Sequence, residues 1–283
     1  MAKLKVAELF YSIQGEGRYM GVPSVFLRTF GCNFKCEGFG MPKGELSDER
    51  NVIALKVDDI RSYNGLPLVS TGCDSYASWD PRFKHLSPVL STDSISDTIM
   101  DMLPHKRWED EHLVITGGEP LLGWQRAYPE LLEHPKMQAL AELTFETNGT
   151  QKLEPKFFDY LRDEWVLERG YDALTFSVSP KLSVSGEKWE EAICPDVVAE
   201  YNSVGYTYLK FVVASQEDID EAQQAVDEYR KAGFTGPVYV MPVGGVESVY
   251  NMNSRNVAEF AIKKGWRYSD RLQVPLFKNE WGT

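Results

Sequence analysis

The chain has little of what marks secreted, membrane-spanning or nucleic-acid-binding proteins. It holds four cysteines in 283 residues and no apolar signal segment after Met1, so we expect a reducing, cytoplasmic compartment and no disulfide framework. No apolar run approaches the ~20 residues of a membrane span. Lys and Arg number 30 against 42 Asp and Glu, and the formal net charge of −12 opposes binding to a phosphate backbone. These shortages exclude a membrane partner and a direct nucleic-acid partner from our expectations.

What is present is a full-sized core and a repeated alternation of strand and helix patterns. The chain is 43% hydrophobic, without internal repeats or low-complexity tracts, and its length fits one large domain or two small ones. Repeated strand–helix units predict an α/β fold, either an open doubly wound sheet or a complete or partial barrel of mainly parallel strands. The expected strands are Val25–Phe30, His112–Thr116, Leu143–Thr147, Ala173–Val178, Tyr208–Val213 and Val238–Met241.

Three segments carry helical periodicity. The clearest one starts at Ser215, a suitable N-cap, and stops at Gly233. A second helix is expected to end at Pro104, and a third to end at Gly265. These helices fall between or after the expected strands, as parallel βα units require.

Three of the cysteines form a split group. Cys32 and Cys36 stand in FGCNFKC, and Cys73 follows after 36 intervening residues in TGCDSYASWD. If the intervening residues loop out, three thiolates can hold three irons of a four-iron cluster and leave the fourth iron open to a small molecule. The alternatives for three scattered cysteines are buried thiols and zinc ligands.

The segment 37–72 between these cysteines interrupts the strand–helix pattern. Its polar composition indicates a solvated insertion, and a lid or a partner-binding element is the alternative. Val52–Val57 in its middle is expected to form an edge strand.

Glycine-rich and polar signals follow four of the expected strands. At the carboxyl ends of parallel strands such turns can build a ligand site, although each one alone is an ordinary strand-to-helix turn. The four segments are Gly117-Gly118-Glu119-Pro120, Asn148-Gly149, Ser179-Pro180-Lys181 and Pro242-Val243-Gly244-Gly245. Together on one rim they can accept a nucleoside with a charged tail. Asn148-Gly149-Thr150 also matches a glycosylation acceptor, but at the end of a strand in a cytosolic chain we interpret it as structural or active-site.

A second polar group lies near the N-terminus. The segment Ile13-Gln14-Gly15-Glu16-Gly17 combines an amide, a carboxylate and exposed backbone, a suitable set of donors and acceptors for a planar heterocycle. Arg28 can clamp a substrate carboxylate with two hydrogen bonds. Its alternative role is a structural ion pair with Glu16 or another acid.

Six motifs in chain order carry a family resemblance: FYSIQGEG, VFLRTFGCNFKC, GCDSYASWD, ITGGEP, FETNGT and SVSPK. From about Val6 to Phe277 the chain resembles 7-carboxy-7-deazaguanine synthase, a family of radical S-adenosylmethionine (SAM) enzymes. The cysteine, CDS and TGGEP motifs are typical of the superfamily, and IQGEG points to this member. The resemblance implies a partial (β/α)6-type barrel, with residues 1–283 as one radical SAM domain that carries the insertion 37–72.

The resemblance also implies a role for each matching position. Cys32, Cys36 and Cys73 would ligate a 4Fe-4S cluster, and Ser75 would supply a hydroxyl to Mg2+ where the family usually has threonine. The implied SAM-binding positions are Gly72, Asp74, Gly118, Ser179, Pro180, Lys181, Met241, Pro242, Val243 and Gly244. The implied substrate-binding positions are Ile13, Gln14, Gly15, Glu16, Arg28 and Thr116.

The implied reaction converts 6-carboxy-5,6,7,8-tetrahydropterin to 7-carboxy-7-deazaguanine with loss of ammonia. Cleavage of SAM would give a carbon radical that takes a hydrogen from the substrate and later returns it, so no side chain need act as a conventional acid or base. The family implies a flavodoxin or ferredoxin electron donor, a homodimer and a cytoplasmic location. The product would feed queuosine-type modification of tRNA, a modified DNA base or a secondary metabolite.

The sequence departs from the family pattern in three places. The insertion splits the cysteine motif. Near the C-terminus Pro275 and Phe277 stand where relatives often have polar residues. The segment Met241-Pro242-Val243-Gly244 keeps a turn but lacks the side-chain donors that relatives carry there.

Two other functions remain open at this stage. One is a different radical SAM enzyme, such as a glycyl-radical activase, although a protein substrate would not need the heterocycle-binding set around Arg28. The other is a non-catalytic protein stabilised by zinc, with Cys194 as a fourth ligand beside the three motif cysteines. Cys194 lies in the helical-looking EEAICPDV, where a buried thiol is the alternative.

Overall fold

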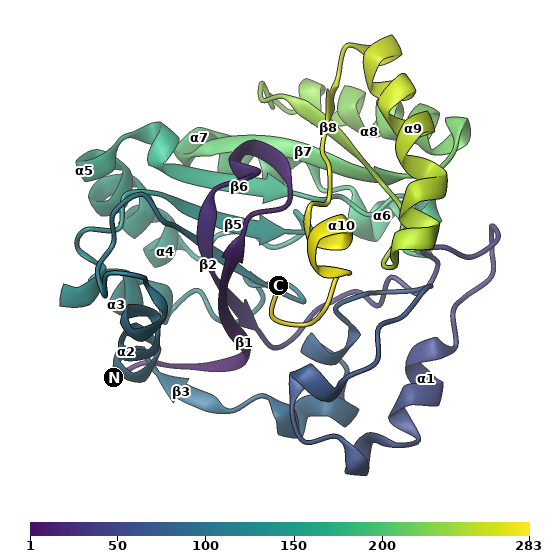
Figure 1. Cartoon of the computed structure of the whole chain (residues 1–283). Helices are drawn as coiled ribbons and strands as arrows, with labels where there is room; N and C mark the ends of the chain where they lie inside the picture. The colour runs from purple at the N-terminus through teal and green to yellow at the C-terminus, as the bar shows by residue number, and fades with distance from the viewer.

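The computed structural model describes residues 1–283 and is built on a single nine-stranded sheet (Figure 1). The strand order is β3-β1-β2-β4-β5-β6-β7-β8-β9, so the sheet is open and its edges are β3 and β9. β1 pairs antiparallel with β2 and with β3, and every pair from β2 to β9 is parallel. The strands are β1 Lys3–Ile13, β2 Pro23–Thr29, β3 Val89–Ser91, β4 His112–Gly117, β5 Leu143–Thr147, β6 Leu174–Val178, β7 Tyr206–Val213, β8 Val238–Pro242 and β9 Arg267–Tyr268.

Helices connect the parallel strands and cover the buried sheet. They are α1 Glu49–Ala54, α2 Thr92–Met102, α3 Tyr128–Leu132, α4 Pro155–Tyr160, α5 Leu167–Arg169, α6 Trp189–Ala192, α7 Pro195–Val204, α8 Gln216–Lys231, α9 Glu247–Lys264 and α10 Gln273–Phe277. A main core of 45 buried residues joins the strands to α2, α3, α4, α7, α8 and α9. None of the helices combines the length and the apolar character that a membrane span requires.

All six expected strands are present, and the expected α/β class is confirmed. The central strands can be predicted from the sequence because a parallel strand is buried on both faces and forms a continuous apolar run. β6 is buried at all five positions. α8 starts at the expected N-cap, where the Ser215 hydroxyl accepts from Asp218 N, and it ends two residues before Gly233. α2 and α9 likewise end where Pro104 and Gly265 indicated.

Two local expectations were wrong. Val52–Val57 is not an edge strand, because α1 occupies Glu49–Ala54 and a short 3-10 turn follows at Val57–Asp59. The segment around Cys194 is not one helix. α6 ends at Ala192 and α7 starts at Pro195, since proline cannot donate the backbone hydrogen bond that a continuous helix needs there.

The insertion 37–72 is ordered and partly buried. Ala54, Ile60, Tyr63, Leu66 and Val69 form a second core together with four residues outside the insertion: Ala7, Tyr76, Ala77 and Phe83. Trp281, from the C-terminal segment, packs against this core with its ring centroid 5.4 Å from that of Tyr63 and 5.6 Å from that of Tyr76. The insertion is therefore more than a solvated loop, since it supports the end of the chain.

Candidate active site

One cavity of about 270 Å³ lies at the carboxyl ends of the parallel strands. Thr116 and Gly117 reach it from the end of β4, Thr147 from the end of β5, and Met241 from β8. The loop that carries Cys32 and Cys36, the insertion and the C-terminal segment form further parts of its wall. This is the rim where the turn signals in the sequence were expected to meet.

The cavity brings together nearly all the residues that the sequence singled out. Those that line it are Ile13, Gln14, Gly15, Glu16, Arg28, Cys32, Cys36, Gly72, Cys73, Asp74, Ser75, Thr116, Gly118, Ser179, Lys181, Met241, Val243 and Gly244. Pro180 and Pro242 are not among the lining residues, so at those two positions any contribution comes from shaping the turn.

The three motif cysteines meet on this cavity from opposite sides of the insertion. Cys36 packs with Phe34 and Ala192, and Cys32 and Cys73 pack against the same small apolar group. Burial raises the pKa of the Cys32 thiol to about 12 and that of the Cys73 thiol to about 11. Two donors reach the sulfurs: Phe34 N lies 3.4 Å from Cys32 Sγ, and Trp79 Nε1 lies 3.4 Å from Cys73 Sγ. Cys36 is buried and the other two cysteines are half-buried. Sulfurs with N–H donors fit iron–sulfur ligation, because such hydrogen bonds tune a cluster's potential.

The loop between Cys32 and Cys36 is held from two sides. Asn148 Nδ2 donates to Asn33 Oδ1 at 2.9 Å, and Asn33 Nδ2 donates to Thr150 Oγ1 at 3.0 Å. On the other side, Glu187 Oε1 accepts from Cys36 N at 2.7 Å. The Asn-Gly-Thr triplet after β5 therefore positions the cysteine loop. Its interpretation as structural or active-site, rather than as a glycosylation acceptor, agrees with these contacts.

The Gly117-Gly118 turn packs directly under the cysteine loop. A Cβ on Gly118 would overlap Gly31 O and lie 2.6 Å from Cys32 Cβ. The next residue, Glu119, is buried, and its carboxylate accepts from Thr147 Oγ1 at 2.8 Å and from Asn148 N at 2.7 Å. Burial outweighs these hydrogen bonds and raises the pKa of Glu119 to about 7. Glycine is thus required for close approach, and Glu119 ties the turn after β4 to the end of β5.

We expect Gly118→Ala to displace the cysteine loop. Overpacking of this kind costs roughly 1–3 kcal/mol of unfolding free energy, and the displaced loop should lower the iron content of anaerobically purified protein. Gly65→Ala is the matched control, because nothing lies within 4 Å of a Cβ built there. Thermal unfolding and iron analysis of both variants measure the effect; a Gly118 variant with full iron content would show that the loop can move aside.

Arg28 has a structural partner and still faces the cavity. Its Nε donates to Glu8 Oε2 at 2.9 Å, and its Nη1 lies 3.3 Å from Ser75 Oγ. The ion pair foreseen for Arg28 is thus made with another acid, Glu8, rather than with Glu16. Ser75 Oγ also lies 3.2 Å from Asp74 Oδ1, so the serine stands between an arginine and a carboxylate. With Nε bound to Glu8 and one hydrogen of Nη1 directed at Ser75, Nη2 and the second hydrogen of Nη1 remain available to an anion in the cavity.

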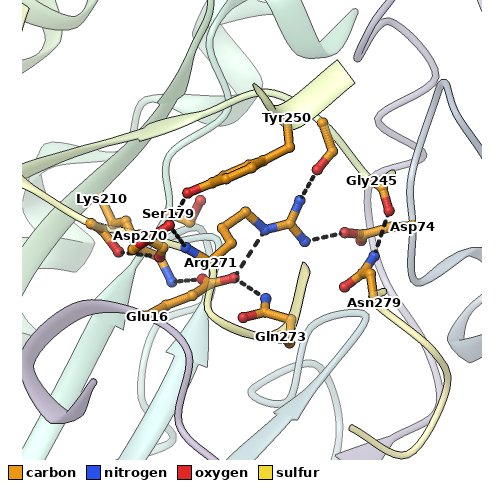
Figure 2. A network of polar contacts seen from close by, with 12 residues as sticks. Glu16, Asp74, Ser179, Lys210, Gly245, Tyr250, Asp270, Arg271, Gln273 and Asn279 are labelled. Carbon is orange, nitrogen blue, oxygen red and sulfur yellow. Dashed lines mark hydrogen bonds and ion pairs between the residues drawn. The ribbon is translucent and has the colours of Figure 1, made fainter. Parts of the chain in front are cut away.

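Glu16 belongs to a buried ionic group at the other side of the cavity (Figure 2). Lys210 pairs with Glu16 Oε2, Gln273 Nε2 donates to Glu16 Oε1 at 2.7 Å, and Arg271 Nε lies 3.3 Å from the same oxygen. Burial by itself would raise the pKa of Glu16, but the charges of Lys210 and Arg271 outweigh it and lower that pKa to about 2. Glu16 is therefore a permanent anion that fixes the Gln14–Gly17 loop.

Sequence reasoning missed several residues of this cavity. Lys210 lies within β7, and its charge in a buried strand was a signal that could have been used. Arg271 and Gln273 come from the C-terminal segment, where only Pro275 and Phe277 had drawn attention as lost polar groups. The missed lining residues with ionisable or amide side chains are Glu8, Glu146, Lys210, Arg271, Gln273, Asn279 and Glu280.

A four-cysteine zinc site does not fit this geometry. Cys194 is not part of the cavity wall; it stands between α6 and α7 and packs against the main core. No three His, Cys, Asp or Glu side chains converge closely enough to hold one metal ion, whereas zinc needs all its ligands within about 2.3 Å of a point. The three motif cysteines instead line one cavity without Cys194.

Comparison with known proteins gives several relatives of nearly the same length. A 7-carboxy-7-deazaguanine synthase from Halobacterium salinarum is 30% identical over 98% of this chain and 91% of that protein. Proteins of the same name from Buchnera aphidicola and Pyrobaculum aerophilum are 30% and 26% identical, over 96% and 99% of this chain and 97% of each relative. No family model matches the chain.

Among solved structures, the crystal structure of QueE from Escherichia coli has a similar fold. The TM-score is 0.53 at 19% sequence identity, over 94% of this chain and 93% of that one. At this level of identity the likeness concerns the fold alone.

Proposed function

Since this chain belongs to the 7-carboxy-7-deazaguanine synthase family, we propose that its large cavity holds an iron–sulfur cluster, SAM and a pterin substrate side by side. The chain is a radical SAM enzyme that converts 6-carboxy-5,6,7,8-tetrahydropterin to 7-carboxy-7-deazaguanine with loss of ammonia. The family expected from the sequence motifs is thereby confirmed. The observation that supports the placement is that the three thiols, Arg28 and the Gln14–Gly17 loop all line one cavity.

Cys32, Cys36 and Cys73 are the proposed ligands of a 4Fe-4S cluster. When bound, the cluster and SAM together supply the electron and the carbon radical that start the rearrangement. The protein's part is to bury Cys36, to half-bury Cys32 and Cys73, and to donate hydrogen bonds to these two sulfurs from Phe34 N and Trp79 Nε1. Reduction requires a donor such as flavodoxin or ferredoxin.

The proposed SAM site follows the ends of β4, β6 and β8. Gly118 leaves room for a ligand beside the cysteine loop, and Lys181 Nζ, which also donates to Ser179 Oγ at 3.1 Å, lies on the cavity wall. An ammonium at this point can bind the carboxylate of an amino acid. The remaining proposed contacts come from Gly72, Asp74 and the Met241–Gly244 segment, with Pro180 and Pro242 shaping their turns.

The proposed pterin site lies between the Gln14–Gly17 loop and Arg28. Gln14 and Glu146 present an amide and a carboxylate, which hydrogen-bond to each other at 3.1 Å and can recognise the edge of a heterocycle. Arg28 holds the substrate carboxylate, and Thr116 and Ile13 complete the wall. Phe10 and Phe26, whose rings stack with centroids 4.9 Å apart, form an apolar part of the cavity wall.

Ser75 is the proposed hydroxyl ligand of Mg2+. Its oxygen lies beside Asp74 and Arg28 in the cavity wall, and the Ser75 hydroxyl would hold the cation there, which would neutralise negative charge on a bound substrate. We further propose that residues 1–283 form one radical SAM domain with the insertion 37–72, and that the enzyme is a cytoplasmic homodimer.

The decisive experiment is turnover of the carboxytetrahydropterin by anaerobically reconstituted protein with a reductant, and identification of the product by mass. We expect 7-carboxy-7-deazaguanine and ammonia in equal amounts. Cleavage of SAM without change of the pterin would support radical SAM activity but refute the carboxytetrahydropterin as the substrate.

Arg28→Ala should weaken substrate binding far more than it affects cleavage of SAM in the absence of substrate. Loss of a bidentate contact to a carboxylate is expected to raise KM for the pterin at least about tenfold. Arg28→Lys, which keeps the charge opposite Glu8, is the matched variant. Its KM for the pterin should fall between those of wild type and Arg28→Ala. Steady-state kinetics with and without pterin separate these effects; an equal loss of both activities in Arg28→Ala would make the residue structural.

A further inference from the structure

Arg271 lies where three separate segments of the cavity wall meet (Figure 2). Its Nη2 donates to Asp74 Oδ2 at 2.6 Å, next to the cluster ligand Cys73. Its Nε lies 3.3 Å from Glu16 Oε1, and its Nη1 donates to Gly244 O. One guanidinium therefore contacts the substrate loop through Glu16, the segment after Cys73 through Asp74, and the SAM-binding turn through Gly244.

These three segments depend on Arg271 for their connection. Glu16 and Asp74 share no hydrogen bond, and both are carboxylates, so without a cation between them they repel each other. The side chain of Arg271 is only 9% exposed, which leaves little water to replace it. A planar guanidinium presents five donors from three nitrogens held in a fixed fork, whereas a lysine ammonium presents three donors from a single nitrogen on a flexible stem and does not hold separated acceptors in a fixed arrangement.

Arg271 is itself held in place by its neighbours. Its backbone N donates to Asp270 Oδ1 at 2.8 Å, and Tyr250 from α9 donates to the same carboxylate. The following residue, Leu272, donates its N to Gly15 O at 3.1 Å. The arginine is thus anchored to α9 and to the substrate loop before it reaches across to Asp74.

We propose that Arg271 is a positioning residue that sets the distance between the pterin and the SAM carbon at which the radical forms. The inference rests on the proposed function for what occupies the cavity. The motivation is that transfer of a hydrogen between two bound molecules needs the reacting atoms within about 3–3.5 Å of each other, and small displacements cost rate steeply. Arg271 is the residue that contacts the binding segments of both molecules.

The test compares Arg271→Lys and Arg271→Gln with a control, Arg267→Lys. Arg267 lies four residues earlier and is exposed. It donates a hydrogen bond of 2.8 Å to Tyr239 Oη, and neither residue lines the cavity. Each reconstituted holoenzyme is assayed for iron content, thermal midpoint and hydrogen exchange of residues 13–17 and 243–246. In parallel, 5′-deoxyadenosine released per deazaguanine formed reports how well the two reacting atoms are aligned.

Arg271→Lys keeps the charge between Glu16 and Asp74, so we expect it to fold, to hold its iron and to show a thermal midpoint close to wild type. Both segments should nevertheless exchange faster, and deoxyadenosine released per product should rise about tenfold or more. Arg271→Gln, which also loses the charge, should show a larger effect in the same direction. The control should behave as wild type in every measurement.

The proposal would be overturned if Arg271→Lys showed wild-type exchange rates and released no more deoxyadenosine per product than wild type. Faster exchange with an unchanged ratio of deoxyadenosine to product would also overturn it. Failure of the wild-type enzyme to form 7-carboxy-7-deazaguanine would instead refute the proposed function. Hydrogen exchange can be measured without turnover. It therefore tests whether Arg271 connects residues 13–17 to residues 243–246 even if the proposed function is refuted.

Discussion

Cys32→Ala, Cys36→Ala and Cys73→Ala are each expected to yield folded protein that holds no intact cluster and forms no product. With three thiolates and one open iron, loss of any ligand leaves two, which is too few to retain a four-iron cluster during purification. The substitutions themselves are small, and the three side chains belong to a minor apolar group rather than to the main core. The effect on activity should therefore far exceed the effect on stability.

Iron and sulfide analysis of the anaerobically purified proteins measures this directly, with about four irons per chain expected for wild type. Cys194→Ala is the matched control, because Cys194 lies away from the cavity between α6 and α7. It should keep its iron and its turnover. Full cluster occupancy in Cys73→Ala would remove the argument that the insertion splits a single cysteine motif.

The sequence predicted the strands that are buried on both faces and missed those at the N-terminal edge and the far edge. β1 spans Lys3–Ile13, but its buried residues lie only in the first half, and Lys5, Glu8 and Ser12 interrupt its apolar pattern. β3 and β9 have three and two residues, too short for any periodicity. An edge strand is defined by its partner in the sheet, which a local pattern does not contain.

The residues of the site likewise fall into those that the sequence could predict and those that it could not. Residues in turns after strands could be predicted, because parallel strands bring their carboxyl ends to one edge. Arg271 and Gln273 could not, since they reach Glu16 from the opposite end of the chain, across sequence separations of 255 and 257 residues. Arg271 and Gln273 line the cavity, whereas Pro275 and Phe277 do not.

Excision of the insertion is expected to separate cluster binding from turnover. The ends of the segment are already close, since Gly72 N donates to Phe39 O at 2.7 Å. Replacing Gly38–Thr71 with a two-residue linker should therefore leave Cys36 and Cys73 within reach of one cluster, because closure entropy changes by only about 0.6 kcal/mol per doubling of loop length. The same excision removes Phe39, Gly40 and Ser70 from the cavity wall.

The excision also removes the support of the C-terminal segment. Tyr63 and its neighbours would no longer cover Trp281, whose segment lines the cavity from Asn279 to Thr283. We expect the shortened protein to keep its iron and to cleave SAM, while product formation falls at least about a hundredfold, because a pterin site open to water positions its ligand poorly.

Two point variants distinguish loss of this wall from general damage to the fold. Trp281→Ala keeps the insertion but removes the side chain that packs against Tyr63 and Tyr76, so it should raise KM for the pterin and leave iron content unchanged. Leu55→Ser changes an insertion residue that is 85% exposed and should have no effect. If the shortened protein retained wild-type turnover, the insertion would be dispensable to the site. If it folded without iron, the insertion would be needed to shape the cluster loop. Only retained iron with lost turnover agrees with an insertion that builds the substrate wall through Trp281.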